Sequence, residues 1–389
     1  MDVLDYIFII LYTITGFVII SFSNKGFNIK DRNNLKKLLF YHLFFGLLFY
    51  FFTVGNKVDS YTYWITAKKI KLNTFNDLFN YSIGTNIVYL LNYIPANILS
   101  MSYFQGTMLY SFLGFLGILY LYSSIKTIFN RINIVIEKNK LFPLILFLPN
   151  FHFWSSGIGK DSIAFFCICY IIYGLVQKKY FKIIIPAILI YVTRPHIIFL
   201  FLTSFVIAFL LDSKIKGYKK IMILIISSIL IAIVLPKIIS FVNIESLNLQ
   251  SIENYTKNKA EALSRDNTGS RVDTSSYSIY YKVFTFLFRP LFFDVTNLMS
   301  LIVSIENFML LILVFKMSRK RVVSLIKKAP YIIKGLLIFY IISALAFSLI
   351  LGNLGIMIRM KNMLMPGFII VVLWVLSVKK NNKTLFRNE

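Results

Sequence analysis

The stretch FHFWSSGIGKDS (residues 151–162) lies between two long apolar runs and contains an adjacent charged pair, Lys160 and Asp161. Repeated apolar stretches close to membrane-spanning length continue on both sides of it along the 389-residue chain. The chain is 58% hydrophobic and 15% charged, whereas soluble domains average roughly 25% charged residues. The sequence therefore predicts an all-α polytopic integral membrane protein. A charged pair in such a chain marks topology, caps a helix or belongs to a site.

About eleven membrane-spanning helices are predicted, with the whole chain, 1–389, as a single membrane domain. Their ranges are 3–22, 38–55, 104–124, 141–154, 162–176, 183–193, 197–211, 221–242, 296–316, 331–352 and 365–378. The segments 141–154, 183–193 and 365–378 are short for a hydrocarbon layer of about 30 Å. Because lipid tolerates no unpaired backbone, we expect them to end inside the protein, around a water-filled cavity. The start MDVLDY lacks the basic region of a cleaved signal peptide, so residues 1–22 are expected to remain as the first helix.

Basic residues gather in alternate loops. Most of the 42 Lys and Arg residues lie in NKGFNIKDRNNLKK, KTIFNRINIVIEKNK, QKKYFK, DSKIKGYKK, KMSRKRVVSLIKKAP and the tail KKNNKTLFRNE. The positive-inside rule assigns these segments to the cytoplasm, which puts the N-terminus outside and the C-terminus in the cytoplasm. The net charge of +26 therefore marks orientation and contact with anionic lipids, and no nucleic-acid partner is expected.

Two long segments fall on the external side of this topology. Residues 56–103 open with NKVDSYTYW and continue through a moderately apolar stretch interrupted by Pro95, which predicts an interfacial or re-entrant helix. Residues 243–295 form the most polar part of the chain and include FTFLFRPLFFD, a second predicted interfacial helix. The sequence thus predicts large external loops that carry interfacial helices.

Unusual polar residues converge on the same external face. They lie in the motifs DSYTYW, GIGKDS, TRPH, FRPLFFD and IMIRMKN and in the second external segment. The candidate site residues are Asp59, Tyr61, Lys160, Asp161, Arg194, His196, Arg271, Arg289 and Arg359. Clustered arginine and lysine side chains suit a phosphate or diphosphate head group. A nearby carboxylate or imidazole suits removal of a proton from an attacking hydroxyl.

Each of these residues also has a structural interpretation, and the sequence leaves both open. Lys160 and Asp161 would form an ion pair that caps a helix, and Arg194 would extend to lipid head groups. Tyr61 would belong to an interfacial aromatic belt. The other candidates would be loop charges or would make one structural hydrogen bond.

The positions of cysteine, histidine and glycine residues bear on disulfides, metal sites and nucleotide-binding loops. Cys167 and Cys169 point in different directions on a helix, so we expect packing roles without a disulfide or a metal. His42, His152 and His196 lack metal-ligand spacing with any cysteine or acid. Neither a Walker A loop nor a GxGxxG motif is present. No ATP-driven pump, metal or cofactor is therefore expected.

Four stretches resemble a known family. LPNFHFWSSGIGKDSIAFF, YVTRPH, VDTSSYSIYYKVFTFLFRPLFFD and GNLGIMIRMKNMLMPGFII are similar to segments of bacterial O-antigen and exopolysaccharide polymerase-like membrane proteins, across roughly residues 50–370. The resemblance implies an oligosaccharide repeat-unit polymerase, which is a membrane glycosyltransferase of capsule, exopolysaccharide or O-antigen synthesis. Such an enzyme transfers a glycan held on undecaprenyl diphosphate onto the next lipid-linked repeat unit. It acts at the outer face of the bacterial cytoplasmic (inner) membrane.

The resemblance also implies roles and partners. Departing diphosphate is expected to meet arginine and lysine side chains, and His196 or Asp59 is expected to act as general base on the acceptor hydroxyl. The expected substrate contacts are Arg194, Lys160, Asp161, Arg289, Arg359, Arg271 and Tyr61. Expected partners are the lipid-linked oligosaccharide, membrane lipids, and a chain-length regulator and flippase of the same pathway.

Two other functions remain open on the sequence. A glycosyltransferase that uses a polyprenyl-phosphate sugar would add a single sugar, and Asp59 in the first external loop is compatible with it. A flippase or transporter of a lipid-linked oligosaccharide would also need cations and aromatic side chains near a cavity. For that function we expect charges at mid-membrane depth and repeat symmetry.

Overall fold

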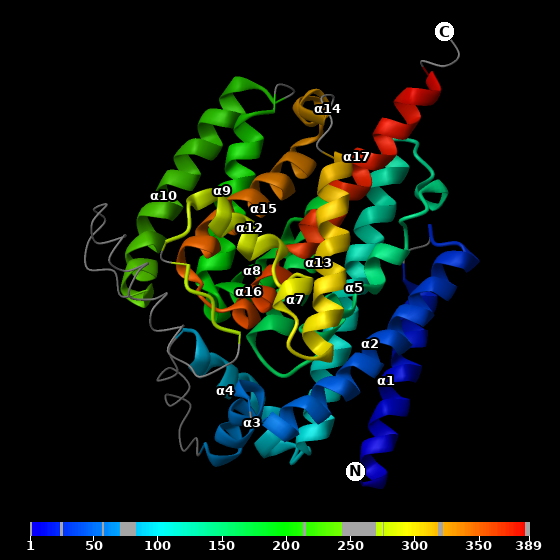
Figure 1. Cartoon of the computed structure of the whole chain (residues 1–389), viewed down its shortest axis with the longest axis vertical. Coiled ribbons are helices and arrows are strands. Elements are labelled where there is room, and N and C mark those ends of the chain that lie inside the picture. Colours follow the sequence, from blue (N-terminus) through cyan, green and yellow to red (C-terminus); the bar gives the residue numbers. More distant parts are fainter. Residues whose placement is uncertain are drawn as a thin grey trace. The chain divides into compact units, whose positions relative to one another are not determined.

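The computed structural model describes residues 2–23, 26–56, 58–70, 83–212, 215–242, 270–274, 276–317 and 322–385 (Figure 1). These residues form helices and connecting turns, with no named β-strand in the described ranges. Six of the described helices are long and apolar enough to cross a membrane, or seven spans result if one bent helix pair counts as one. This confirms a helical membrane architecture, while the count of eleven spans and their orientation stay predictions. The chain divides into two compact units, Met1–Pro195 and His196–Glu389.

Unit 1 is built around one long, buried helix, α5. Its helices are α1 (Val3–Phe22), α2 (Ile29–Asn56), α3 (Asp59–Lys69), α4 (Thr85–Tyr93), α5 (Tyr103–Arg131), α6 (Pro149–Phe153), α7 (Lys160–Gln177) and α8 (Phe181–Thr193). α5 packs against α2 and α7, and α8 packs against α7. α2 runs antiparallel to α5, because Tyr50 contacts Phe104 towards one end and Asp31 bonds to Tyr122 towards the other.

Glycines on α5 allow neighbouring backbone to approach closely. A Cβ atom at Gly114 would lie 2.1 Å from the backbone oxygen of Ser155, which is far inside van der Waals contact. A Cβ at Gly117 would lie 3.2 Å from the Cα of Phe166 on α7. Small residues serve this purpose in membrane helix packing, where dispersion contacts replace the hydrophobic driving force. α5 therefore holds both α7 and the residues just before it in direct contact.

The predicted span 141–154 is wrong as a membrane-crossing helix. Leu144–Phe147 form a short 3₁₀ turn, and Pro149–Phe153 form the single short helix α6. Proline stands at 143 and at 149, where it has no N–H to donate to a preceding turn of a continuing helix. Apolar composition alone predicted a helix here, and the prolines divide it.

The two segments predicted to be external contain helices whose limits differ from the prediction. Within 56–103, α3 and α4 are separate helices, and Pro95 lies in a π-helical turn, Ile94–Ile98, that continues α4. Residues 71–82 of this segment lie outside the described residues. Within 243–295, the helix predicted for FTFLFRPLFFD (residues 284–294) is only partly present. α12 (Ile279–Phe288) includes its first five residues and ends before Arg289 and Pro290, and a 3₁₀ turn, Phe292–Asp294, follows. Residues 243–269 and 275 lie outside the described residues.

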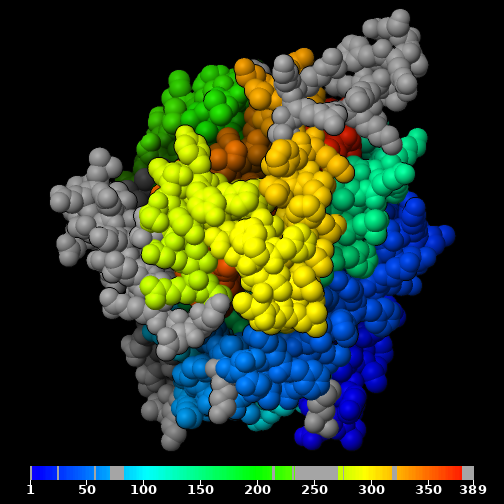
Figure 2. All heavy atoms as spheres, in the orientation of Figure 1, coloured from blue at the N-terminus to red at the C-terminus, as the bar shows by residue number. Residues whose placement is uncertain are grey.

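Unit 2 contains helices of seven to 26 residues and one bent helix pair. Its helices are α9 (Pro195–Leu210, of which Pro195 closes unit 1), α10 (Gly217–Val242), α12, α13 (Leu298–Met317), α14 (Val322–Lys328), α15 (Tyr331–Ile350), α16 (Leu354–Asn362) and α17 (Met365–Leu385). α15 packs against α12 and α17, and α12 and α13 lie side by side on one face of the unit (Figure 2). α16 and α17 meet at a bend of 64°, which forms either a broken span or a re-entrant loop.

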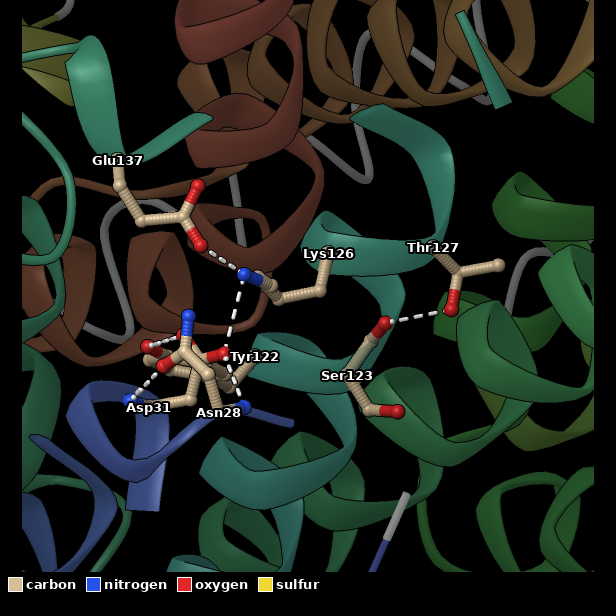
Figure 3. A network of polar contacts seen from close by, with 7 residues as sticks. All are labelled: Asn28, Asp31, Tyr122, Ser123, Lys126, Thr127 and Glu137. Atoms are coloured by element: carbon tan, nitrogen blue, oxygen red, sulfur yellow. Dashed lines mark hydrogen bonds and ion pairs between the residues drawn. The ribbon is translucent and has the colours of Figure 1, made fainter. Parts of the chain in front are cut away.

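A buried network of charges fastens one end of α2 to α5 (Figure 3). The Nζ of Lys126 on α5 lies 3.0 Å from Oδ2 of Asp31 on α2 and forms a second ion pair with Glu137. The hydroxyl of Tyr122 donates to Asp31 over 2.7 Å. The Asp31 side chain is fully buried and that of Lys126 is 6% exposed. One ammonium group thus neutralises carboxylates from the start of α2 and from the turn after α5.

Replacing Lys126 by methionine is expected to destabilise unit 1 by about 3–5 kcal/mol, because it leaves the buried Asp31 carboxylate without its cation. The measurement is thermal unfolding of the purified protein in detergent. The matched control is Lys138→Met, since Lys138 is an exposed lysine in the neighbouring 3₁₀ turn. Equal melting temperatures for the two variants would contradict the structural role of the network.

Candidate functional site

The loop before α7 is shaped by glycines. Gly159 has φ of +147° and directly precedes Lys160, the first residue of α7. A Cβ at Gly157 would lie 2.1 Å from the ring of Phe49. The hydroxyl of Ser162 donates to the carbonyl oxygen of Gly157 over 2.7 Å, which closes the loop against the helix. The GIGKDS motif therefore presents its charged pair on a tightly fixed turn, because only glycine accommodates these positions.

Three segments of unit 1 meet at this turn. Arg194 follows the last residue of α8, and its guanidinium forms an ion pair with the carboxylate of Asp161. The Arg194 side chain is 11% exposed and that of Asp161 is 8% exposed. Lys160 Nζ donates to the Thr85 hydroxyl at the start of α4 over 2.7 Å, and the backbone N–H of Gly84 donates to the carbonyl of Val192 over 2.8 Å. We call Lys160, Asp161, Arg194 and Thr85 the α7 cluster.

Tyrosines line the α3 side of the α7 cluster. The ring of Tyr63 lies beside Gly159, where a Cβ would be in ordinary contact at 3.4 Å. Tyr63 packs edge-on against Tyr89 of α4, with ring centroids 5.9 Å apart. Tyr61 packs against Tyr103 instead, with centroids 5.3 Å apart, and Asp59 is exposed in the first turn of α3. Tyr63 is thus the tyrosine of DSYTYW that lies beside the loop, whereas the predicted Tyr61 packs against Tyr103.

The α7 cluster is set back from the first residue of α5, measured along the axis of that helix. Gly117 of α5 faces Phe166 of α7, and the Gln177 amide donates to Thr127 over 3.0 Å further along both helices, so the two run parallel. Fourteen residues of α5 precede Gly117, and six residues of α7 precede Phe166. At 1.5 Å per residue, α7 begins about 12 Å further along the axis than α5. The charged start of α7 is therefore recessed within the unit.

The remaining candidate residues belong to unit 2. Arg289 forms a bidentate pair with Asp294, with Nε–Oδ2 at 3.0 Å and Nη2–Oδ1 at 2.5 Å. Arg271 is exposed and forms an isolated β-bridge with Asn353, the residue that caps α16. Arg359 is partly buried on α16. His196, the second residue of α9, packs edge-on against Phe347 with centroids 5.9 Å apart.

The Arg289–Asp294 pair changes how both groups titrate. Hydrogen bonding to Asp294 raises the pKa of Arg289 above its ordinary value, against the opposing effect of burial. Burial raises the pKa of Asp294, but hydrogen bonds from Arg289 and from the backbone N–H of Leu291 outweigh it, so its pKa is lowered below 3.8. The charged forms are thus favoured, and Arg289 stabilises the turn between α12 and α13.

Acidification is expected to remove this contribution. A lowered folded pKa gives stability that is present above the ordinary Asp pKa and is lost as pH falls through the folded value, here below about pH 4. Asp294→Asn should melt at a lower temperature than wild type at pH 7, and the difference should shrink as the pH approaches 3. Asp59→Asn, at an exposed carboxylate, is the control. A wild-type advantage over Asp294→Asn that does not shrink between pH 7 and 3 would contradict the pairing.

A buried histidine pair was not predicted from the sequence. Nδ1 of His42 on α2 lies 2.9 Å from Nδ1 of His152 on α6, and His152 Nε2 lies 2.6 Å from the Leu146 carbonyl oxygen. Because a carbonyl only accepts, His152 carries its proton on Nε2 and its Nδ1 accepts from His42. The two residues stand 110 positions apart, so no sequence spacing signals the contact. The pair holds α6 against α2, ahead of the loop that leads to the α7 cluster.

Comparisons with known proteins found no protein similar to this chain. A scan against protein-family models, a search of curated proteins and a search of solved structures each gave no match to this chain. Within the described ranges, no group of three or more His, Cys, Asp or Glu side chains is arranged to hold a metal ion. The site is therefore defined by its own geometry: a recessed, tyrosine-lined cluster of two cations and one carboxylate in a membrane protein.

Proposed function

We propose that the protein is an oligosaccharide repeat-unit polymerase of the bacterial cytoplasmic membrane, which transfers a glycan from undecaprenyl diphosphate onto the next lipid-linked repeat unit. The observation that carries the proposal is the α7 cluster, with Lys160 and Arg194 held about 12 Å behind the start of α5. A diphosphate leaving group needs cationic ligands, and Lys160 and Arg194 supply two of them in one cluster.

Charge and environment in the α7 cluster support an anionic leaving group. Arginine binds phosphate oxygens in a bidentate manner, and lysine adds a point charge. Both cations are partly shielded from solvent, which strengthens their effect on charge that develops during bond cleavage. Asp161 keeps Arg194 in position when no anion is bound. Tyr89, which is partly exposed and packs against the buried Tyr63 beside the loop, offers an aromatic face for the apolar face of a sugar ring.

The proposed reaction is a displacement at the anomeric carbon. The acceptor hydroxyl oxygen forms the new bond, the bond between the anomeric carbon and the diphosphate oxygen breaks, and the electron pair leaves with the diphosphate. Arg194 and Lys160 neutralise that charge, and a carboxylate or imidazole takes the hydroxyl proton. Asp59, in the same unit as the α7 cluster, is the proposed base, and His196 stays the alternative base that the sequence predicts. In unit 2, Arg271 and Arg359 stay predicted substrate contacts, while Arg289 is committed to Asp294 and is assigned a structural role.

A flippase or transporter of a lipid-linked oligosaccharide is the second candidate. One observation favours it: Lys361 of unit 2 is buried and bonds to Asn307, near the middle of the candidate span α13. Charges at that depth and a helix bend beside them are typical of transport proteins. The third candidate is a glycosyltransferase that adds one sugar from a polyprenyl phosphate. The experiment below distinguishes it from both the polymerase and the flippase.

The test is deletion of the gene in its host, followed by gel analysis of the extracted surface glycan beside a complemented strain. A polymerase predicts that the ladder collapses to a single repeat unit and returns with the wild-type gene. A full ladder with one sugar missing from every repeat indicates the single-sugar transferase. Loss of all surface glycan, with lipid-linked units retained inside the cell, indicates the flippase.

A further inference from the structure

Lys361 is a lysine buried at mid-membrane depth. It is 1% exposed, and its Nζ donates to Oδ1 of Asn307 on α13. α13 begins at Leu298 and is a candidate span of 20 residues. At 1.5 Å per residue, Asn307 lies about 14 Å along it, close to the middle of a hydrocarbon layer of about 30 Å. Lysines in spans ordinarily extend to the interface, so one held at this depth indicates a specific role.

Oxygen atoms from two other helices surround the ammonium group. Besides Asn307 Oδ1, Lys361 Nζ donates to the carbonyl oxygen of Leu287 over 3.1 Å. Leu287 is the penultimate residue of α12, a helix of ten residues, and its carbonyl belongs to the last turn, which has no partner within the helix. Carbonyl groups at the ends of short helices carry partial negative charge and coordinate monovalent cations in membrane proteins.

The orientation of Asn307 is fixed. Its Nδ2 donates to the carbonyl oxygen of Pro290 over 2.9 Å, so Oδ1 must face Lys361. Glu306 is 3% exposed, and its carboxylate interacts electrostatically with the ammonium group. The surroundings therefore supply an amide oxygen, a backbone oxygen and a compensating negative charge. Hard monovalent cations prefer this kind of ligand set.

We propose that these oxygens form a monovalent-cation site at the middle of unit 2, and that the ammonium group of Lys361 fills it as a tethered cation. Lys361 stands two residues before the 64° bend between α16 and α17. Its side chain ties the end of α16 to α12 and α13, so the filled site holds the bend. This site lies in a different unit from the α7 cluster and does not depend on the proposed glycosyl transfer.

The test is thermal unfolding of purified Lys361→Ala in sodium chloride, methylammonium chloride and choline chloride at equal concentration. Removing the side chain leaves room for a small cation beside Glu306. In choline, whose cation is too large, the variant should melt at least about 3 °C below wild type. Sodium or methylammonium should restore half of that loss or more, because binding to the folded state alone stabilises it. Wild type should melt at one temperature in all three salts.

Two further variants keep the test decisive. Lys361→Met fills the space with an apolar chain of similar length, so it should lose stability and gain nothing from sodium or methylammonium. If Lys361→Ala yields no folded protein, the Lys361→Ala, Glu306→Gln double variant should recover it, because the buried negative charge that Lys361 balances is gone as well. The proposal is overturned if Lys361→Ala melts identically in the three salts, or if the double variant also fails to fold.

Discussion

Arg194→Ala is expected to abolish polymer formation, with at least a 100-fold fall in chain extension relative to wild type. Loss of one preorganised donor to a developing negative charge costs about 100- to 1,000-fold in rate, and the Arg194 guanidinium is largely shielded from solvent beside Asp161. The measurement is the glycan ladder of a deletion strain complemented with the variant gene. Arg194→Lys should keep a shortened ladder, since it retains the charge and loses the bidentate geometry.

Controls separate catalysis from folding in this experiment. Arg194→Ala removes the cation that pairs with the buried Asp161 carboxylate, which by itself destabilises the fold. The Arg194→Ala, Asp161→Asn double variant removes that charge, and its level in the membrane should match wild type while the ladder stays absent. Arg131→Ala, at an exposed arginine that ends α5, should leave the ladder intact. Near-normal polymer from Arg194→Ala would refute the diphosphate role.

Gly114→Ala is expected to have the largest effect on stability of any single methyl added to α5. Its Cβ would lie 2.1 Å from the Ser155 backbone oxygen and 2.6 Å from Nε2 of His42, so backbone must move. The Ser155 carbonyl belongs to the loop that presents the α7 cluster, and the shift should displace Lys160 as well. Overpacking of this kind costs about 1–3 kcal/mol or more.

The measurement for Gly114→Ala is melting temperature together with polymer formation, and both should fall. Gly55→Ala is the matched control, because Gly55 lies near the end of α2 and a Cβ there meets nothing within 4 Å. That substitution should be neutral or stabilise the helix by up to about 1 kcal/mol. Similar melting temperatures for the two variants would show that α5 and the loop are less tightly packed than described.

The apolar runs predicted the helical membrane architecture, but they did not predict the residues at which individual helices begin and end. The predicted span 38–55 lies inside α2, which begins at Ile29 and includes Asp31. An aspartate in the sequence argues against a membrane span at that position. In the structure, Lys126 from another helix neutralises Asp31, and the sequence does not show this pairing. The prediction of a span at 141–154 was wrong for the opposite reason. It relied on the apolar composition of the segment, although two prolines interrupt a helix there.

The candidate site was predictable in part. The motifs DSYTYW, GIGKDS and TRPH were assigned to one face by counting spans, and in unit 1 Tyr63, Asp161 and Arg194 do come together. Long-range partners were beyond the sequence: nothing in its spacing pairs His42 with His152. The place of Lys361 was also beyond the sequence, because the bend after α16 and the contact with Asn307 arise only from tertiary packing.

Reconstitution tests the central claim most directly. The purified protein in proteoliposomes would receive a single substrate, undecaprenyl diphosphate carrying one repeat unit of the host glycan, without nucleotide sugar or ATP. The account predicts lipid-linked chains of two or more repeat units and release of undecaprenyl diphosphate in equal number to the new bonds. A substrate that stays at one repeat unit with wild-type protein, under conditions where the protein remains folded, would contradict the account.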